Sequence, residues 1–119
     1  MFKIGYYTYY NLSVRNDIDL ESQRAAAVRL AEMFELSEKE KEHIGNTEYP
    51  FDFISYDSMK WYDWENDMTK LSEEFPGIEF VLYGEGEERD DTWRAFFKNG
   101  ECIYQPAHIY YDPEPRFDD

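Results

Sequence analysis

Basic residues are scarce in this 119-residue sequence: 12 lysines and arginines stand against 27 aspartates and glutamates, for a formal net charge of −15. Proteins that bind nucleic acid or anionic membranes do so through basic surfaces. The shortage of basic charge therefore excludes a simple nucleic-acid-binding protein and argues against docking on a membrane surface. The sequence also has no run of about 18 apolar residues, so it predicts no membrane span.

Cysteine is nearly absent, since Cys102 is the only one. No internal disulfide can form, which is typical of a reducing compartment, and we expect a cytoplasmic protein. The first residues lack the basic-then-apolar pattern of a signal peptide. No glycine-rich phosphate loop and no catalytic motif of high specificity is present, so we expect neither a cofactor nor an enzyme.

Aromatic residues, by contrast, make up 19% of the chain. Disordered acidic chains are poor in aromatics, so this composition indicates a folded domain despite the charge. The length fits one small domain. We expect that domain over residues 1–111, followed by a frayed acidic tail over residues 112–119, which contains two prolines.

Local patterns predict the elements of the first half. Alternation of apolar residues predicts a strand over residues 3–14, and Asp19 can cap a helix that begins at Leu20. A capping-box pattern that starts at Ser37 predicts a second, short helix. Alternating aromatic residues predict a short strand over residues 51–56.

The second half begins with a clean helical stripe. Apolar residues spaced 4, 3 and 4 apart predict a helix from about Asp63, which Pro76-Gly77 ends. A strand is predicted over residues 78–83, and residues 84–91 have the composition of a Gly- and acid-rich loop.

Asn99-Gly100 is the strongest short hairpin signal in the chain, because both turn positions need a positive φ. It predicts strands over residues 92–98 and 101–105. A two-residue turn sets the register as Lys98 opposite Glu101, Phe97 opposite Cys102 and Phe96 opposite Ile103. Pro106 breaks the second strand, and residues 108–111 could resume it.

The predicted order is strand, helix, strand, helix and three strands. The simplest arrangement places the helices on one face of a mainly antiparallel sheet, because the apolar faces of the helices and of the sheet then bury each other. The sequence therefore predicts an α+β fold, with a sheet of four to five strands and two main helices on one face.

One stretch, from Lys60 to Gly100, carries a more specific pattern. Its residues are Lys60-Trp61-Tyr62-Asp63, Asp67-Met68, Leu71-Ser72, Phe75-Pro76, Phe80, Leu82, Gly84-Glu85-Gly86-Glu87, Asp91, Trp93, Phe97-Lys98 and Asn99-Gly100. This stretch resembles small phage, prophage and plasmid proteins with a domain of the YubB or Api92 type. The resemblance implies a ferredoxin-like α+β sandwich and offers no catalytic residues to carry over.

The acidic loop is the first candidate site. Clustered carboxylates can hold Mg²⁺ or Ca²⁺, but the spacing is not that of an EF-hand, and we expect no metal. The loop could instead be a solvated connection between strands, or a negative docking surface for a partner. The candidate partner-binding residues are Tyr83, Glu85, Glu87, Glu88, Asp90 and Asp91.

The charge is unevenly distributed along the chain. Residues 1–60 carry 7 basic and 11 acidic side chains, for a net −4, whereas residues 61–119 carry 5 and 16, for a net −11. A negative surface of this kind can compete with nucleic acid for a basic channel. The leading hypothesis is a phage or mobile-element inhibitor that mimics DNA and blocks a basic nucleic-acid-binding host protein, as anti-CRISPR or anti-restriction proteins do.

Two alternatives stay open. The Tyr-rich first strand could make the chain a structural domain that oligomerises through its sheet, for example as a homodimer, since tyrosine is favoured at protein interfaces. A metal-dependent hydrolase that uses the acidic loop is the third hypothesis.

Overall fold

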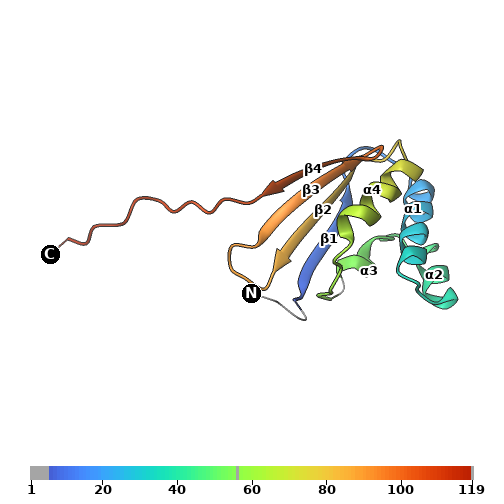
Figure 1. Cartoon of the computed structure of the whole chain (residues 1–119), viewed down its shortest axis with the longest axis horizontal. Helices are drawn as coiled ribbons and strands as arrows, with labels where there is room; N and C mark the ends of the chain where they lie inside the picture. The colour runs from blue at the N-terminus through green and yellow to red at the C-terminus, as the bar shows by residue number, and fades with distance from the viewer. Residues whose placement is uncertain (1–5, 56, 119) are drawn as a thin grey trace.

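A four-stranded antiparallel sheet packed against helices makes up the fold in the computed structural model, which describes residues 6–55 and 57–118 (Figure 1). The strand order along the sheet is β1-β2-β3-β4. The elements are β1 (Thr8–Val14), α1 (Leu20–Met33), α2 (Glu38–Ile44), α3 (Asp52–Ser55), α4 (Trp64–Glu74), β2 (Phe80–Gly86), β3 (Thr92–Lys98) and β4 (Glu101–Pro106). The α+β class and the antiparallel sheet of four strands are therefore confirmed.

The strongest local signals predicted their elements correctly. Asp19 caps α1, because its side chain accepts a hydrogen bond from the Ser22 backbone N–H at 2.9 Å. The capping box at Ser37 is formed in both directions with Glu40, and α2 follows it. The apolar stripe of α4 is buried at Met68 and Leu71.

The short strand predicted over residues 51–56 is wrong, because this segment contains the helical turn α3. Phe51 and Ile54, three residues apart, are the buried pair, whereas the alternating pattern assigned Phe51 and Phe53 to one face. α3 packs against β1, which is an edge strand of the sheet. Tyr56, the last residue of this predicted strand, lies outside the described residues. Residues 1–5 do so as well, and they include the first three residues of the strand predicted over residues 3–14.

The hairpin was predicted in its correct register. Asn99 and Gly100 have φ values of 45° and 82°, and Lys98 pairs with Glu101, Phe97 with Cys102 and Phe96 with Ile103. β2, however, continues through Gly86, so the loop begins at residue 87 rather than at 84. Residues 108–111 form no strand, because the chain has already passed the start of β3 and has no neighbour to pair with.

The element order also differs from the prediction. All of the helices in the described part of the chain lie between β1 and β2, and β2, β3 and β4 follow one another directly. A ferredoxin-like domain has the order βαββαβ. α4 contacts β3 and β4, and α3 contacts β1, whereas α1 packs against α4 and α2.

The sheet has one covered and one open face. On the covered face, the side chains of Leu12, Leu82 and Phe97 are buried with those of the helices. On the open face, Tyr9, Tyr83 and Ile103 are 60%, 44% and 52% exposed. Side chains alternate across a strand, so the even-numbered residues of β1 and the odd-numbered residues of β3 form the core.

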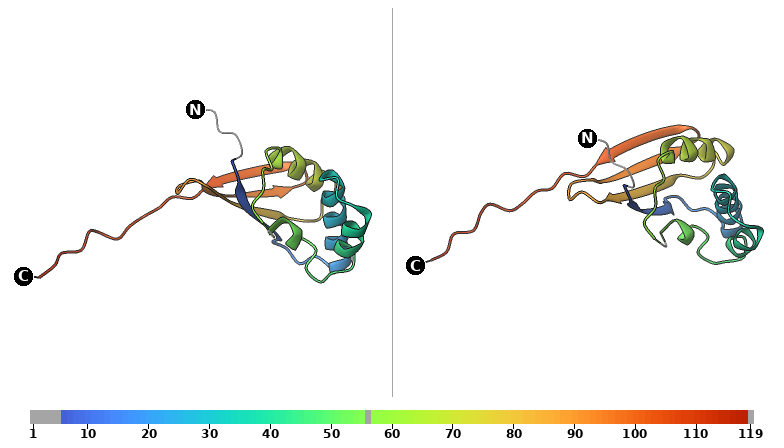
Figure 2. Two further views of the ribbon diagram at one scale, coloured as in Figure 1. Left: turned by 90° about the horizontal axis from the view of Figure 1, so that it is seen from below. Right: turned by 60° about the horizontal axis from the view of Figure 1, so that its bottom comes forward.

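Beyond β4, the chain runs extended and exposed through residues 107–118 (Figures 1 and 2). Both views of Figure 2 show this segment leaving the sheet on the side away from α1 and α2. We call residues 107–118 the tail. None of the helices in the described ranges is long and apolar enough to cross a membrane.

Candidate functional site

The β2–β3 loop and the tail leave the sheet at the same end. The last described pairing of β1 with β2 joins Thr8 to Gly86, and the Ala107 N–H donates to the Thr92 carbonyl at 2.8 Å. The Arg89 guanidinium also donates to the Tyr111 hydroxyl at 2.9 Å, which connects loop and tail. We call this region, loop 87–91 together with the tail, the acidic end.

The structure divides the predicted partner-binding residues into three groups. Glu87, Glu88 and Asp90 are exposed in the loop. Tyr83 and Glu85 are exposed on the open face of β2, two residues apart. Asp91 points to the covered face instead, so the six residues do not form one continuous surface.

Asp91 organises the loop from within. The Tyr6 hydroxyl donates a hydrogen bond to the Asp91 carboxylate and accepts one from the Glu88 backbone N–H at 3.2 Å. The Gly86 N–H donates to the Asp91 carbonyl at 2.8 Å. Burial, the hydrogen bond to Asp91 and the charge of that carboxylate together raise the pKa of Tyr6 to about 12. The phenol is therefore neutral, and a donor, at neutral pH.

This contact predicts a pH dependence at the alkaline end. The pKa of Tyr6 is higher in the folded state than its ordinary value of 10.0, so its contribution to stability is present below pH 10 and is lost between about pH 10 and 12. Burial also raises the pKa of Tyr10 and Tyr104, so absorbance titration of the tyrosines should show several late phenols, and the phase near pH 12 should be smaller by one phenol in Tyr6→Phe. If Tyr6→Phe instead loses one phenol from the phase near pH 10 and keeps the late phase unchanged, this assignment is wrong.

An aromatic pocket lies on the covered face next to Asp91. It has a volume of about 260 Å³, and seven of its nine lining residues are aromatic. They include all three tryptophans of the chain. The full lining, which we call the aromatic pocket, is Tyr6, Thr8, Tyr10, Trp61, Tyr62, Trp64, Asp91, Trp93 and Tyr104.

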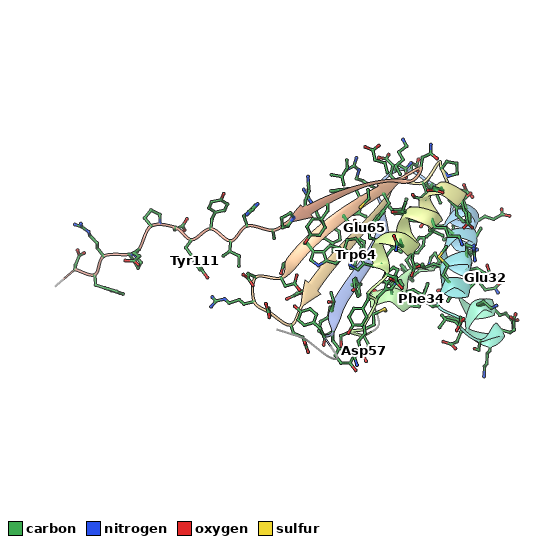
Figure 3. The ribbon with its side chains drawn as sticks, in the orientation of Figure 1. Glu32, Phe34, Asp57, Trp64, Glu65 and Tyr111 are labelled. Atoms are coloured by element: carbon green, nitrogen blue, oxygen red, sulfur yellow. The ribbon has the colours of Figure 1, made fainter. Side chains whose placement is uncertain are left out.

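The rings of the pocket hold one another in place. Trp64 stacks on Trp93 with ring centroids 4.3 Å apart, and Trp61 meets Tyr10 edge to face at 5.3 Å. Figure 3 shows Trp64 between α4 and the sheet. Burial raises the pKa of Tyr10. Burial is also the main cause that raises the pKa of Tyr104, and the negative charge of Asp91 adds to it. Both phenols are therefore neutral at physiological pH, and Asp91 carries the only carboxylate that the described residues contribute to the lining.

Two glycines of β2 make room for this pocket. A Cβ atom at Gly84 would lie 2.3 Å from the indole ring of Trp93, and one at Gly86 would lie 2.2 Å from both Asp91 Oδ2 and the Tyr6 hydroxyl. Contacts this short are sterically impossible without movement. The paired glycines, which suggested a turn from the sequence, therefore allow a ring and a carboxylate to lie against a strand.

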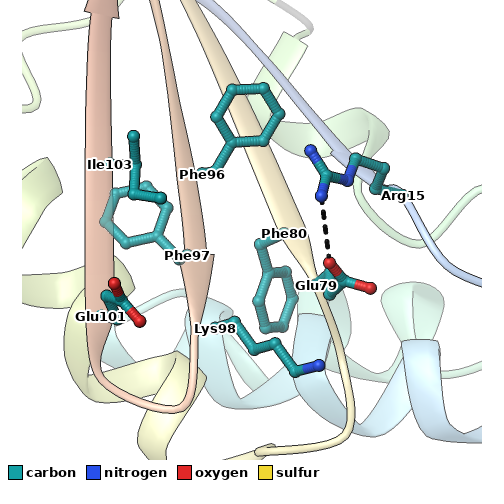
Figure 4. Close-up of a pocket in the computed structure, with 8 residues that line it drawn as sticks. All are labelled: Arg15, Glu79, Phe80, Phe96, Phe97, Lys98, Glu101 and Ile103. Carbon is teal, nitrogen blue, oxygen red and sulfur yellow. Dashed lines mark hydrogen bonds and ion pairs between the residues drawn. The ribbon is translucent and has the colours of Figure 1, made fainter.

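A second, smaller hollow lies at the other end of the sheet (Figure 4). Its volume is about 160 Å³, and Phe96 and Ile103 contribute apolar surface to it. The Arg15 guanidinium lies 4.8 Å from the Phe96 ring centroid and forms an ion pair with Glu79 at 3.3 Å. The Arg94 guanidinium lies 5.1 Å from the centroid of the same ring, so both arginines pack against Phe96.

Metal and thiol chemistry find no support in the described part of the chain. No group of three or more His, Cys, Asp or Glu residues in it is arranged to hold a metal ion. Burial, and then the charge of Glu65, raise the pKa of Cys102, which disfavours the reactive thiolate.

The chain has no match among protein-family models, curated proteins or solved structures. The resemblance to the YubB or Api92 type therefore stays a prediction.

Proposed function

We propose that this protein is a non-enzymatic binding protein whose partner is a basic protein, and that the acidic end is its binding surface. One observation carries the proposal: the loop and the tail, two separate acidic segments of the chain, leave the sheet at the same end. Residues 87–91 contain four acidic residues and one basic residue, and the tail contains three and one. Both segments carry a net negative charge, and the Arg89–Tyr111 hydrogen bond connects them where the tail begins.

The neighbouring surface supplies contact area that charge alone does not. Tyr83 is 44% exposed on the open face, and Tyr111 is 75% exposed on the tail. Tyrosines combine a large apolar ring with a polar tip and are enriched at interfaces. Carboxylates steer a basic partner toward this end, and the aromatic rings then provide packing.

The partner class that fits best is a basic nucleic-acid-binding protein of the host. Such a protein has a cleft lined by Lys and Arg to neutralise phosphates, and rows of carboxylates can occupy it. Inhibition by DNA mimicry is therefore the specific form of the proposal. A phage or mobile-element origin, and a location in the host cytoplasm, belong to the same proposal and rest on the sequence resemblance.

Competition with DNA tests this function. A basic DNA-binding domain is loaded with a fluorescent DNA duplex, and the full chain is added while anisotropy is followed. We expect the chain to displace the duplex, because both occupy the same basic surface. Binding of the chain without displacement of the duplex would contradict DNA mimicry, and no binding at all would contradict the acidic-end proposal.

Self-association is the second candidate, favoured by the exposed open face and by the edge strand β4. Every residue of β4 except Cys102 is exposed, including Ile103 and Tyr104. An uncovered edge of this kind can pair with a second copy. Sedimentation velocity should then show a dimer that strengthens with salt, since two chains of charge −15 repel each other. A monomer at every salt and protein concentration would contradict it.

A further inference from the structure

The aromatic pocket has the chemistry of a cation-binding site. Among the described residues, seven aromatic side chains line a volume of about 260 Å³, and the one charged group in that lining is the carboxylate of Asp91. The faces of aromatic rings carry negative potential and attract cations, most strongly when water is excluded. A carboxylate at the edge of such a box adds a full negative charge on the same side.

The rings are fixed before any ligand arrives. The Trp61 indole N–H donates to Asp67 at 2.7 Å, and the Tyr10 hydroxyl donates to the Trp61 carbonyl at 3.1 Å. Trp61, Trp93 and Tyr10 are each at most 7% exposed. Because the polar atoms of Tyr10 and Trp61 are used within the protein, these two residues offer ring surface to the cavity. A site fixed in this way loses little conformational entropy on binding.

The sequence uses unusual residues to build this space. Gly84 lies in the interior of β2, where glycine weakens the sheet, and Gly86 is the last residue of that strand, yet a side chain at either position would collide with Trp93 or with the Asp91–Tyr6 pair. The backbone of β2 therefore accommodates both the flat indole and the carboxylate of the pocket.

The balance of donors and acceptors selects the kind of cation. A guanidinium carries five N–H donors and a primary ammonium carries three, and each donor that is buried without a partner costs free energy. The side-chain acceptors of the lining are the Asp91 carboxylate, which already accepts from Tyr6, and five hydroxyl oxygens, whereas the ring faces and the three indoles accept no conventional hydrogen bond. A methylated ammonium has the same charge, more apolar surface and no N–H donors when it is fully methylated.

We propose that the aromatic pocket binds a quaternary or trimethylated ammonium group. This inference deepens the proposed function and rests on it in one respect, since a trimethylated lysine of a basic partner is one source of the group. A free choline-like molecule is the other source. Both present the same cationic head to the rings and to Asp91.

Intrinsic fluorescence can test the pocket directly, because all three tryptophans line it. The full chain is titrated with tetramethylammonium chloride, with choline, and with a trimethyllysine peptide and its unmodified form. We expect a saturable change with tetramethylammonium that sodium chloride does not produce. We also expect none with 3,3-dimethylbutanol, the uncharged isostere of choline. Equal responses to the charged and the uncharged compound, or no response to tetramethylammonium, would overturn the proposal.

Two variants locate the binding on the pocket. Tyr62 is 66% exposed, so Tyr62→Ala should fold normally and weaken tetramethylammonium binding by about tenfold through loss of one ring. Asp91→Asn should weaken it by a similar factor. Tyr49→Ala, which removes an equally exposed tyrosine outside the pocket, should have no effect. If Tyr62→Ala binds as tightly as the unmodified chain, the pocket is not the site.

The separate titrations distinguish this inference from the proposed function. Preference for the trimethyllysine peptide over choline identifies a protein side chain as the source, and the reverse preference identifies a free small molecule. If the pocket binds no cation but the chain still displaces DNA from a basic domain, the inference fails and the proposed function stands. If the chain binds tetramethylammonium but no basic protein, the inference about the pocket stands and the proposed function fails.

Discussion

Replacing Gly84 with alanine is expected to lower the free energy of unfolding by about 2 kcal/mol, because the new methyl group forces the Trp93 ring out of its position. The Cβ atom would lie 2.3 Å from two carbons of the indole. Neither the strand nor the ring can move easily, since Gly84 is buried between β1 and β3 and Trp93 is stacked on Trp64. Urea denaturation followed by circular dichroism measures the change.

Gly77→Ala is the matched control for this substitution. A Cβ atom at Gly77 would meet no atom within 4 Å, so the same chemical change there should leave stability unchanged or raise it slightly by restricting the unfolded chain. If the two alanine variants unfold at the same urea concentration, the close approach of Trp93 to β2 is not what requires glycine at position 84.

Reversing two charges in the β2–β3 loop is expected to weaken binding to a basic partner by at least about tenfold. In Glu87→Lys with Asp90→Lys, both exposed side chains would face the cations of the partner with like charge, which costs free energy and slows association. The dissociation constant and the association rate, measured by surface plasmon resonance at low salt, report both effects. We expect much of the change in the association rate.

The control must change the net charge equally at another place. Glu42 and Glu48 are also exposed, but they lie in α2 and in the segment that follows it, away from the acidic end. Glu42→Lys with Glu48→Lys should therefore weaken binding only slightly. If the two double variants lose the same affinity, binding depends on total charge rather than on the acidic end.

Local signals in the sequence predicted local structure well. Asp19, Ser37 and the Asn99-Gly100 turn each act through neighbours a few residues away, and the structure shows the caps and the hairpin that they predict. The segment around Phe53 was misjudged because two or three aromatic residues fit a strand and a helical turn equally well. Packing of α3 against β1, which the local pattern does not contain, decides between them.

The order of the elements could not be deduced in the same way. The order of the elements depends on which strand pairs with β1, and that pairing joins residues from 66 (Val14 and Phe80) to 78 (Thr8 and Gly86) positions apart. The length of β2 was underestimated for a related reason. Gly84 and Gly86 have the composition of a turn, and their role becomes evident only when Trp93 and Asp91 lie against them.

The candidate site was predicted in part. The acidic loop was identified from its composition, but Asp91 belongs to a contact with Tyr6, 85 residues away, rather than to an exposed surface. The aromatic pocket was missed, because its residues come from separate parts of the chain and share no spacing: Trp93 lies in β3 and Tyr104 in β4, whereas Tyr6 and Trp61 lie outside the helices and strands. One signal was available in the sequence. The chain is strongly acidic and short, yet it contains three tryptophans, which are large rings that need a buried site.

The salt dependence of binding tests the central claim most directly. The association constant of the full chain with a basic DNA-binding domain is measured over a range of salt concentrations, for the unmodified chain and for the Glu87→Lys, Asp90→Lys variant. If the acidic end is the binding surface, the logarithm of the constant falls as the logarithm of the salt concentration rises, and the slope is shallower in the variant. A constant that does not change with salt, or an identical slope for the two proteins, would contradict the account.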